Sequence, residues 1–164
     1  MTDYPSWDGL AAQIENEDVE PEVRSRALSA IPILKHYLGS AWPSEAVGTG
    51  HALLEPFFNQ SEWTRHCLSD VAASMEAVSI LPGWDQLLQR ILRPTEAIGA
   101  LFELDLAARG LKRSLGVALE PPTQERRHAD LALSLRGPSP VTLYVEASTL
   151  HHMTRDEREA DDFI

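Results

Sequence analysis

The 164-residue chain contains one cysteine, Cys67, and no long apolar run. A single cysteine excludes an intramolecular disulfide and a cysteine-based zinc site, and we expect Cys67 to be a small buried apolar side chain. The first ten residues lack the basic and apolar stretches of a signal peptide. No run of about 18 apolar residues is present to span a membrane. These absences predict a cytoplasmic protein without a membrane partner.

Basic residues are also scarce. The chain carries 14 Lys and Arg against 25 Asp and Glu, which gives a formal net charge of −11. Proteins that bind nucleic acid or anionic membranes normally present a cationic surface. The composition therefore argues against a general coat for either partner but leaves room for a small local site. Apolar residues at 43% and charged residues at 24% are ordinary for one globular domain.

The first 92 residues have the pattern of helices separated by proline and glycine. Ser6 is a candidate N-cap for a short helix, and Pro21 suits the first turn of a helix over 22–38 that ends at Gly39. Pro32 lies within that helix and is expected to kink or split it.

Ser61 precedes the clearest helical pattern, over 62–81, which Pro82 and Gly83 end. A further short helix is expected over 84–92. The apolar positions of the 62–81 helix recur at helical spacing: Trp63, Cys67, Val71, Met75 and Val78.

The pattern changes after Pro94. Thr95 is a candidate N-cap for a helix over 96–109 that Gly110 would end. This helix is apolar on most sides, which predicts a buried element rather than a half-exposed one.

Three strand-like runs follow this helix, over 116–120, 129–135 and 141–147, and a last polar helix is expected from Thr154 onward. The chain therefore reads as an α+β protein. A helical region, 1–92, precedes a second region, 93–164, that contains the strands.

The charge is divided unevenly along the chain. Residues 1–92 carry five basic and thirteen acidic groups, a net charge of −8, and residues 93–164 carry nine and twelve, a net charge of −3. Within 109–136 there are six basic and three acidic groups, a net charge of +3. The global acidity therefore conceals a locally basic segment around the strands.

The second and third strands predict an antiparallel hairpin around Pro138. In the symmetric register, Ser134 lies opposite Thr142 and Ala132 lies opposite Tyr144. Because side chains alternate between the two faces of a strand, this register sorts all the leucines and valines onto one face, which should be core. A slip by one residue would destroy the sorting.

The same register places Asp130 opposite Glu146. Facing side chains have Cβ atoms about 4.5–5.5 Å apart, and like charges there are destabilising. Solvent, a proton, a basic side chain or a cation would offset the repulsion, and a hard divalent cation with oxygen ligands would suit it. A solvated polar face of the hairpin is the simpler interpretation.

Glu103 adds a third carboxylate. The helix over 96–109 carries a line of small and acidic residues within its apolar surface. Small residues let a helix approach a sheet closely, so an acid within that line lies at a wet edge or faces a partner. An ordinary exposed glutamate is the alternative. The line consists of Glu96, Gly99, Ala100, Glu103 and Ala107.

These segments resemble the core of the PD-(D/E)XK nuclease superfamily, the restriction endonuclease-like fold. The resemblance covers about residues 95–150 and is carried by FELDLAARG, GVALEPP, RRHADLALSL and VTLYVEAST. It implies a helix, three antiparallel strands, a second helix and a further strand. A helix glutamate, an aspartate at the start of strand two and an acid-x-Lys tripeptide in strand three match Glu103, Asp130 and residues 146–148.

The resemblance implies metal-dependent hydrolysis of DNA phosphodiesters. Asp130 and Glu146 would hold Mg²⁺ or Mn²⁺, with Glu103 as an outer or second ligand, and Ser148 would complete the catalytic set. The local basic residues would meet DNA phosphates: Lys112, Arg113, Arg126 and Arg127.

Two departures from the family pattern affect this expectation. Ser148 stands where the family has lysine, and losing such a charged group typically lowers the rate by a factor on the order of 10²–10⁴. The family's last strand has no counterpart, so the core reads as incomplete. Three explanations stay open: a fragment of a longer protein, a truncated reading frame, or a trimmed variant whose sheet a protein partner or a second copy completes.

Three functions therefore remain open. One is a nuclease-like domain, divergent or catalytically impaired. Another is a non-catalytic protein-interaction or scaffold module on the same fold. In the third, the helical first half is a protein-interaction domain and the strand-containing region only caps it.

Overall fold

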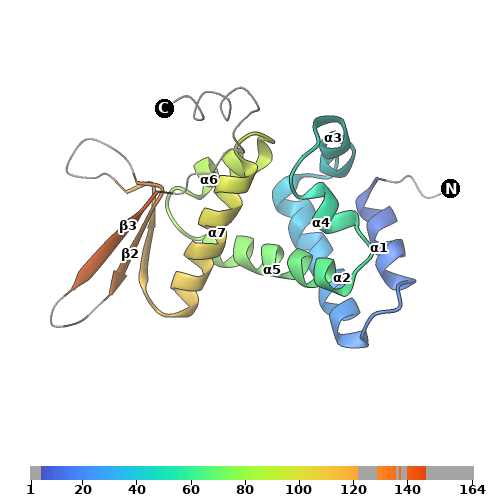
Figure 1. Cartoon of the computed structure of the whole chain (residues 1–164), viewed down its shortest axis with the longest axis horizontal. Coiled ribbons are helices and arrows are strands. Elements are labelled where there is room, and N and C mark those ends of the chain that lie inside the picture. The colour runs from blue at the N-terminus through green and yellow to red at the C-terminus, as the bar shows by residue number, and fades with distance from the viewer. Residues whose placement is uncertain (1–4, 122–128, 136, 138–139, 147–164) are drawn as a thin grey trace, which may run out of the picture.

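The computed structural model describes residues 5–121, 129–135, 137 and 140–146. Within these residues, seven helices precede a three-stranded sheet, and Figure 1 shows the sheet at the opposite end of the molecule from α1. The architecture is α+β. The elements are α1 (Trp7–Glu15), α2 (Pro21–Leu38), α3 (Trp42–Thr49), α4 (Leu54–Phe58), α5 (Glu62–Val78), α6 (Trp84–Leu92), α7 (Ala97–Lys112), β1 (Gly116–Leu119), β2 (Leu131–Leu135) and β3 (Val141–Val145).

Local signals in the sequence set the ends of the first helices. The Ser6 hydroxyl accepts a hydrogen bond from the Gly9 amide at 2.9 Å and caps α1. Pro21 occupies the first turn of α2, and this helix ends at Gly39, where φ is +98°. Pro32 does not split α2, contrary to one of the expected outcomes. Its neighbour Ile31 and the residues one turn away are buried, and this packing holds the helix together.

The helix α5 differs from its predicted form in length and orientation. It begins after the Ser61 capping box but ends at Val78, three residues early. The predicted apolar line is buried only toward its end, since Trp63 is 69% exposed and Cys67 is half-buried. Burial raises the pKa of the Cys67 thiol. The buried face of α5 is rotated about the helix axis, by about one residue position, from the predicted apolar line. It includes Arg65 and Leu68.

The helix α7 continues past Gly110 to Lys112, so the prediction that Gly110 ends it is wrong. A Cβ at Gly110 would lie 2.8 Å from Leu133 Cδ2 and 2.9 Å from Val117 Cγ2. The glycine therefore serves close packing of the helix on the sheet. The large apolar residues Ile98 and Phe102 are 61% and 54% exposed, so α7 is not buried on all sides.

The strand register agrees with the prediction. The strand β2 pairs antiparallel with β3, with Ala132 opposite Tyr144 and Ser134 opposite Thr142, and β1 pairs with β2 on its other side. The hydroxyls of Ser134 and Thr142 lie 3.0 Å apart. The period-two sorting of side chains thus specifies the pairing.

The apolar face of the hairpin is only partly core, contrary to expectation. Leu131 is buried and Leu133 packs against the core, because α7 covers β1 and β2. The side chains farther along the same face are exposed. They are Leu135 at 57%, Val141 at 57% and Leu143 at 59%.

One continuous core runs through the described residues, from Trp7 and Leu10 in α1 to Leu104 in α7 and Leu131 in β2. It crosses the boundary near residue 92 between the two regions of the sequence. His51 is buried within it and binds the Ile91 carbonyl oxygen at 2.7 Å. No helix in the part of the chain that the structure describes is long and apolar enough to cross a membrane.

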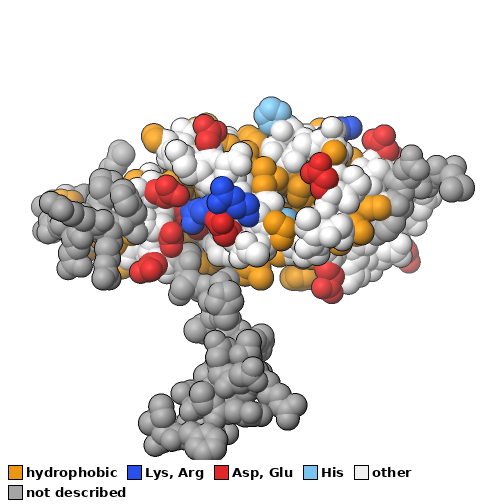
Figure 2. Space-filling view, turned by 90° about the horizontal axis from the view of Figure 1, so that it is seen from above, with side chains coloured by type: hydrophobic (Ala, Val, Ile, Leu, Met, Phe, Trp, Pro, Cys, Tyr) orange, Lys and Arg blue, Asp and Glu red, His pale blue; other side chains and the backbone are white. Residues whose placement is uncertain are grey.

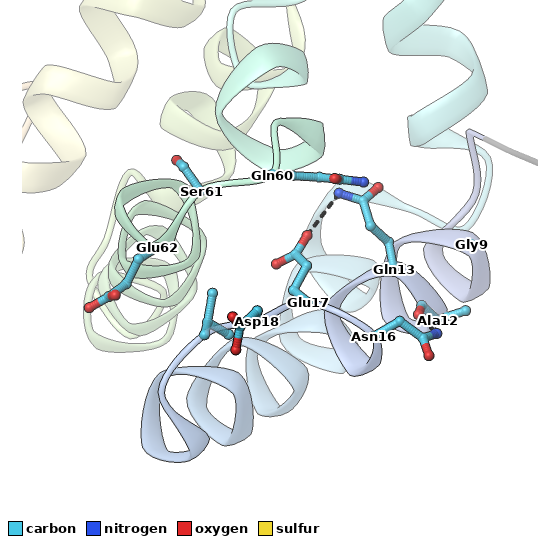
Figure 3. A pocket seen from close by; sticks show the side chains of 10 residues that line it. Gly9, Ala12, Gln13, Asn16, Glu17, Asp18, Gln60, Ser61 and Glu62 are labelled. Carbon is cyan, nitrogen blue, oxygen red and sulfur yellow. Dashed lines mark hydrogen bonds between the residues drawn. The ribbon is translucent and has the colours of Figure 1, made fainter.

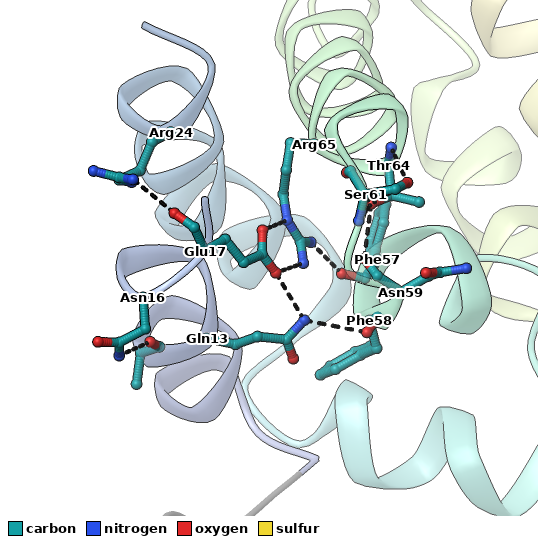
Figure 4. Close-up of polar contacts among 11 residues, drawn as sticks. Gln13, Asn16, Glu17, Arg24, Phe57, Phe58, Asn59, Ser61, Thr64 and Arg65 are labelled. Atoms are coloured by element: carbon teal, nitrogen blue, oxygen red, sulfur yellow. Dashed lines mark hydrogen bonds and ion pairs between the residues drawn. The ribbon is translucent and has the colours of Figure 1, made fainter. Parts of the chain in front are cut away.

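A buried ion pair ties the turn after α1 to α4 and α5 (Figure 4). Arg65, fully buried on α5, donates from Nε to Glu17 Oε2 at 2.6 Å and from a terminal nitrogen to the Phe57 carbonyl at 2.7 Å. Its other terminal nitrogen donates to Glu17 Oε1. Burial alone would raise the pKa of Glu17, but hydrogen bonds from Arg65 and Gln13 outweigh it and lower the pKa. All three guanidinium nitrogens therefore have acceptors.

We predict that Arg65→Met lowers the free energy of unfolding by about 3–5 kcal/mol, because it leaves the Glu17 carboxylate and the Phe57 carbonyl without their donor. Urea denaturation measures this loss. The control is Arg26→Met, which removes an exposed pair with Asp70 at 3.8 Å and should cost under about 1 kcal/mol. Equal losses in the two variants would contradict the prediction.

Candidate functional site

Carboxylates from three elements converge on one guanidinium group. Arg90, near the end of α6, donates to Glu103 Oε2 on α7. It also lies 3.4 Å from Asp130 Oδ1 before β2, and its Nε lies 3.7 Å from Glu120 Oε1 after β1. We call these four residues the Arg90 cluster. Figure 2 shows basic side chains surrounded by acidic ones on the face of the molecule near the sheet.

Packing of α7 explains why Glu103 lies inside. Its side chain is fully buried, on the same face as the buried residues Ala100, Ala107 and Gly110. These small residues bring the helix close to the sheet, as the line of small residues predicted. Glu103 therefore faces a partner rather than a wet edge.

The ends of two strands supply the other acids. Beyond the last β1–β2 pair, the Glu120 amide donates to the Asp130 carbonyl at 2.9 Å. Glu120 has a φ of +45°, a left-handed conformation that is unusual for a residue other than glycine. The bond and the turn bring both side chains to the end of the sheet that faces α6 and α7.

The surroundings of Glu103 bring its pKa close to neutral pH, where the protonated and the ionised side chain are both populated. Burial raises its pKa to about 7, and Asp130 and Glu120 act in the same direction, while Arg90 opposes the shift. Its Oε1 atom is buried and has no hydrogen-bond partner. One positive charge thus faces three carboxyl groups, and a proton on Glu103 lowers the remaining negative charge.

The donor set does not fit a divalent metal in this arrangement. Within the described residues, no three His, Cys, Asp or Glu side chains form a group able to hold a metal ion. The cation between Glu103 and Asp130 is instead the Arg90 guanidinium. Glu103 Oε1 is a buried carboxylate oxygen without a hydrogen-bond partner, which is the character of an open ligand position.

The third carboxylate predicted for the site is Glu146. Glu146 follows Val145, the partner of Leu131, and is exposed. Ser148 lies outside the described residues, as do Arg126 and Arg127.

Two of the basic residues expected to meet DNA lie away from the Arg90 cluster. Lys112 and Arg113 line a separate hollow between α5 and α7. Lys112 is nine positions along the helix from Glu103, or roughly 14 Å at about 1.5 Å per residue. The structure therefore brings Glu103 and Asp130 together but does not add these cations to them.

Sequence reasoning did not identify Arg90 or Glu120. A basic side chain was one of the expected ways to offset the acids, but nothing singled out Arg90. The available signal was the position of Arg90 on an amphipathic helix, between the buried residues Leu87 and Ile91. Such a position is compatible with simple solvent exposure, so only the packing of α6 on α7 reveals its role.

A second hollow, of about 630 Å³, lies beside the turn after α1 (Figure 3). Its lining includes the amides Gln13, Asn16 and Gln60, with Glu17 and Glu62 among its acids. Gln13 donates to Glu17 at 3.0 Å and to the Phe58 carbonyl at 3.2 Å. Glu17 also holds Arg65. These groups support the helix packing, so we place no site there.

Comparisons of the chain with protein-family models, curated proteins and solved structures find no match.

We predict a distinctive pH dependence for Glu103→Gln. Between pH 4.5, the ordinary pKa of the group, and about 7, the unfolded chain loses the Glu103 proton before the native protein does. The native state then binds more protons, so the wild type loses stability as pH rises across this window. The wild type should therefore lose up to about 3 kcal/mol relative to Glu103→Gln.

Urea denaturation at a series of pH values measures this difference. Glu76→Gln, which changes an exposed glutamate on α5, is the control and should keep the wild-type profile. A difference between the wild type and Glu103→Gln that stays constant from pH 4.5 to 7 would contradict the assigned protonation.

Proposed function

We propose that this protein is a PD-(D/E)XK-like domain in which an internal arginine stands in place of the metal ion. On this view it acts as a non-catalytic interaction or scaffold module. The observation that carries the proposal is the contact of Arg90 with both Glu103 and Asp130. These are two of the three carboxylates that the family resemblance assigns to the metal.

The chemistry of a guanidinium group supports this reading. Arginine remains protonated at all physiological pH values and offers planar donors to carboxylates. It neutralises the acids as a cation does, but it has no open coordination position for water or a phosphoryl oxygen. The serine at position 148, where the family has lysine, removes a second group that the hydrolysis needs.

Metal-dependent phosphodiester hydrolysis of DNA is the second candidate. It is favoured by the buried and unpartnered Oε1 of Glu103, because such an acceptor normally binds a proton or a cation. This candidate requires Arg90 to leave the carboxylates. A DNA partner bound through Lys112, Arg113, Arg126 and Arg127 belongs to the same candidate.

We predict that the wild type binds no Mn²⁺ at the Arg90 cluster, whereas Arg90→Ala does, because Glu103 then loses its counter-ion. Calorimetric titration with Mn²⁺ measures binding, and the added affinity should vanish in Arg90→Ala/Asp130→Ala. Arg90→Lys keeps the positive charge and is the matched control, expected to resemble the wild type. Circular dichroism checks that each variant is folded.

The two candidate functions predict different effects of the single substitution Asp130→Ala. Metal binding or Mn²⁺-dependent cleavage of plasmid or single-stranded DNA that disappears in Asp130→Ala would overturn the proposal in favour of the nuclease. Cleavage that survives both Asp130→Ala and Glu146→Ala would identify a contaminant. Absence of Mn²⁺ binding in folded Arg90→Ala would contradict the substitution of a metal by arginine.

A further inference from the structure

A cleft between α4, α5 and α7 presents apolar side chains to solvent. It encloses about 500 Å³ and is separate from the Arg90 cluster. In Figure 1, α5 runs between α7 on one side and α4 on the other. Figure 2 shows hydrophobic side chains in the middle of the face seen there. The apolar lining is Ala52, Leu53, Pro56, Trp63, Cys67, Val71, Ile98, Leu101 and Leu104.

Two helical stripes form the walls of the cleft. Ile98, Leu101 and Asp105 follow one another at helical spacing on α7, and Trp63, Cys67 and Asp70 do so on α5. Ile98 is 61% exposed and Trp63 is 69% exposed, so both stand at the rim. A groove between two helix faces matches the way a third amphipathic helix packs.

The exposure of the rim favours an extended occupant over a small molecule. A small ligand is mostly buried within its pocket, so it would leave Trp63 and Ile98 in water. A helix lying along the cleft would cover the rim and fill the hollow with its apolar side chains. Exposed apolar surface of this kind typically marks an interaction site.

The charged residues around the cleft indicate which kind of helix would bind there. Asp70 and Asp105 line the cleft together with His66, which lies 3.8 Å from Glu62, and no Lys or Arg among the described residues does so. Glu55 and Glu62, both exposed, lie next to the lining residues Pro56 and Trp63. Arg26 and Arg109 pair with the two aspartates from outside the cleft, at 3.8 and 2.7 Å.

The same charges disfavour two other occupants. A second copy of a chain with a net charge of −11 would bring like charges together. An anionic membrane surface would be repelled for the same reason.

We propose that this cleft binds an amphipathic helix of a partner protein, with an apolar face flanked by Lys and Arg. The inference extends the proposed interaction role by naming a surface and a partner chemistry. Its test leaves Arg90 untouched, so the two proposals can fail separately. Absence of helix binding would contradict the assignment of this surface, whereas metal-dependent cleavage would contradict the proposed function.

The probe is a fluorescein-labelled 18-residue peptide of Leu and Lys, with Leu at positions i, i+3, i+4 and i+7. Anisotropy should show saturable binding to the full chain. A scrambled peptide of equal composition and a Leu/Glu peptide should bind at least tenfold more weakly.

Ile98→Ser should weaken binding at least fivefold. Ile80→Ser is the matched control, since Ile80 is 80% exposed but lies outside the cleft, and it should stay within twofold.

Tryptophan emission gives a second readout with unlabelled peptide. The other three tryptophans, Trp7, Trp42 and Trp84, are at most 8% exposed, so Trp63 is the tryptophan in water. Binding should shift the emission to shorter wavelength, and Trp63→Phe should abolish that shift. Asp70→Asn should weaken binding and reduce its salt dependence.

Several results would overturn the proposal. They are equal binding of the scrambled or Leu/Glu peptide, equal losses in Ile98→Ser and Ile80→Ser, and absence of binding. A concentration-dependent dimer that Ile98→Ser disrupts would assign the cleft to a second copy instead. Tight one-to-one binding of an apolar dye that the peptide does not displace would assign it to a small molecule.

Discussion

The fold around the sheet depends on one arginine side chain that joins three elements. Arg90 extends from α6 to Glu103 on α7, to Asp130 before β2 and to Glu120 after β1. Glu103 is fully buried, and an ionised carboxylate in that position without a counter-ion would be strongly destabilising. The place of α6 on α7 is therefore tied to the acids at the end of the sheet, because α6 supplies the charge that those acids need.

The acidic cluster follows from close packing of a helix on a sheet. Gly110 lets α7 approach until a Cβ at this position would overlap Leu133 and Val117. Along the same face, Ala107 and Ala100 keep the helix close, and the side chain between them, Glu103, is carried inside. A buried carboxylate is thus a result of the small residues around it. Replacing them by larger residues would move the helix outward and expose the acid to water.

The parts predictable from the sequence are those with a local or periodic cause. The hairpin register followed from period-two sorting around Pro138, whereas the small neighbours of Glu103 predicted a close approach to the sheet but left open whether the acid was buried or exposed. Tertiary contacts decided the rest. Arg90 has no local pattern that separates it from an exposed helix residue, and Ile98 is exposed because no described element covers that side of α7. Apolar periodicity identifies a helix face but not what packs against it.

The balance of charge in the Arg90 cluster explains why a proton matters there. Among the four residues of the Arg90 cluster, three carboxyl groups face one guanidinium, so ionisation of all three leaves these four side chains with a net negative charge beside a buried helix. A divalent cation would supply one more positive charge than arginine does, and a proton on Glu103 supplies the same correction. Burial raises the pKa of Glu103 to about 7, and the charges of Asp130 and Glu120 add to this shift. An arginine in this position therefore stabilises the cluster while leaving it sensitive to pH, whereas a bound metal ion would hold Glu103 ionised.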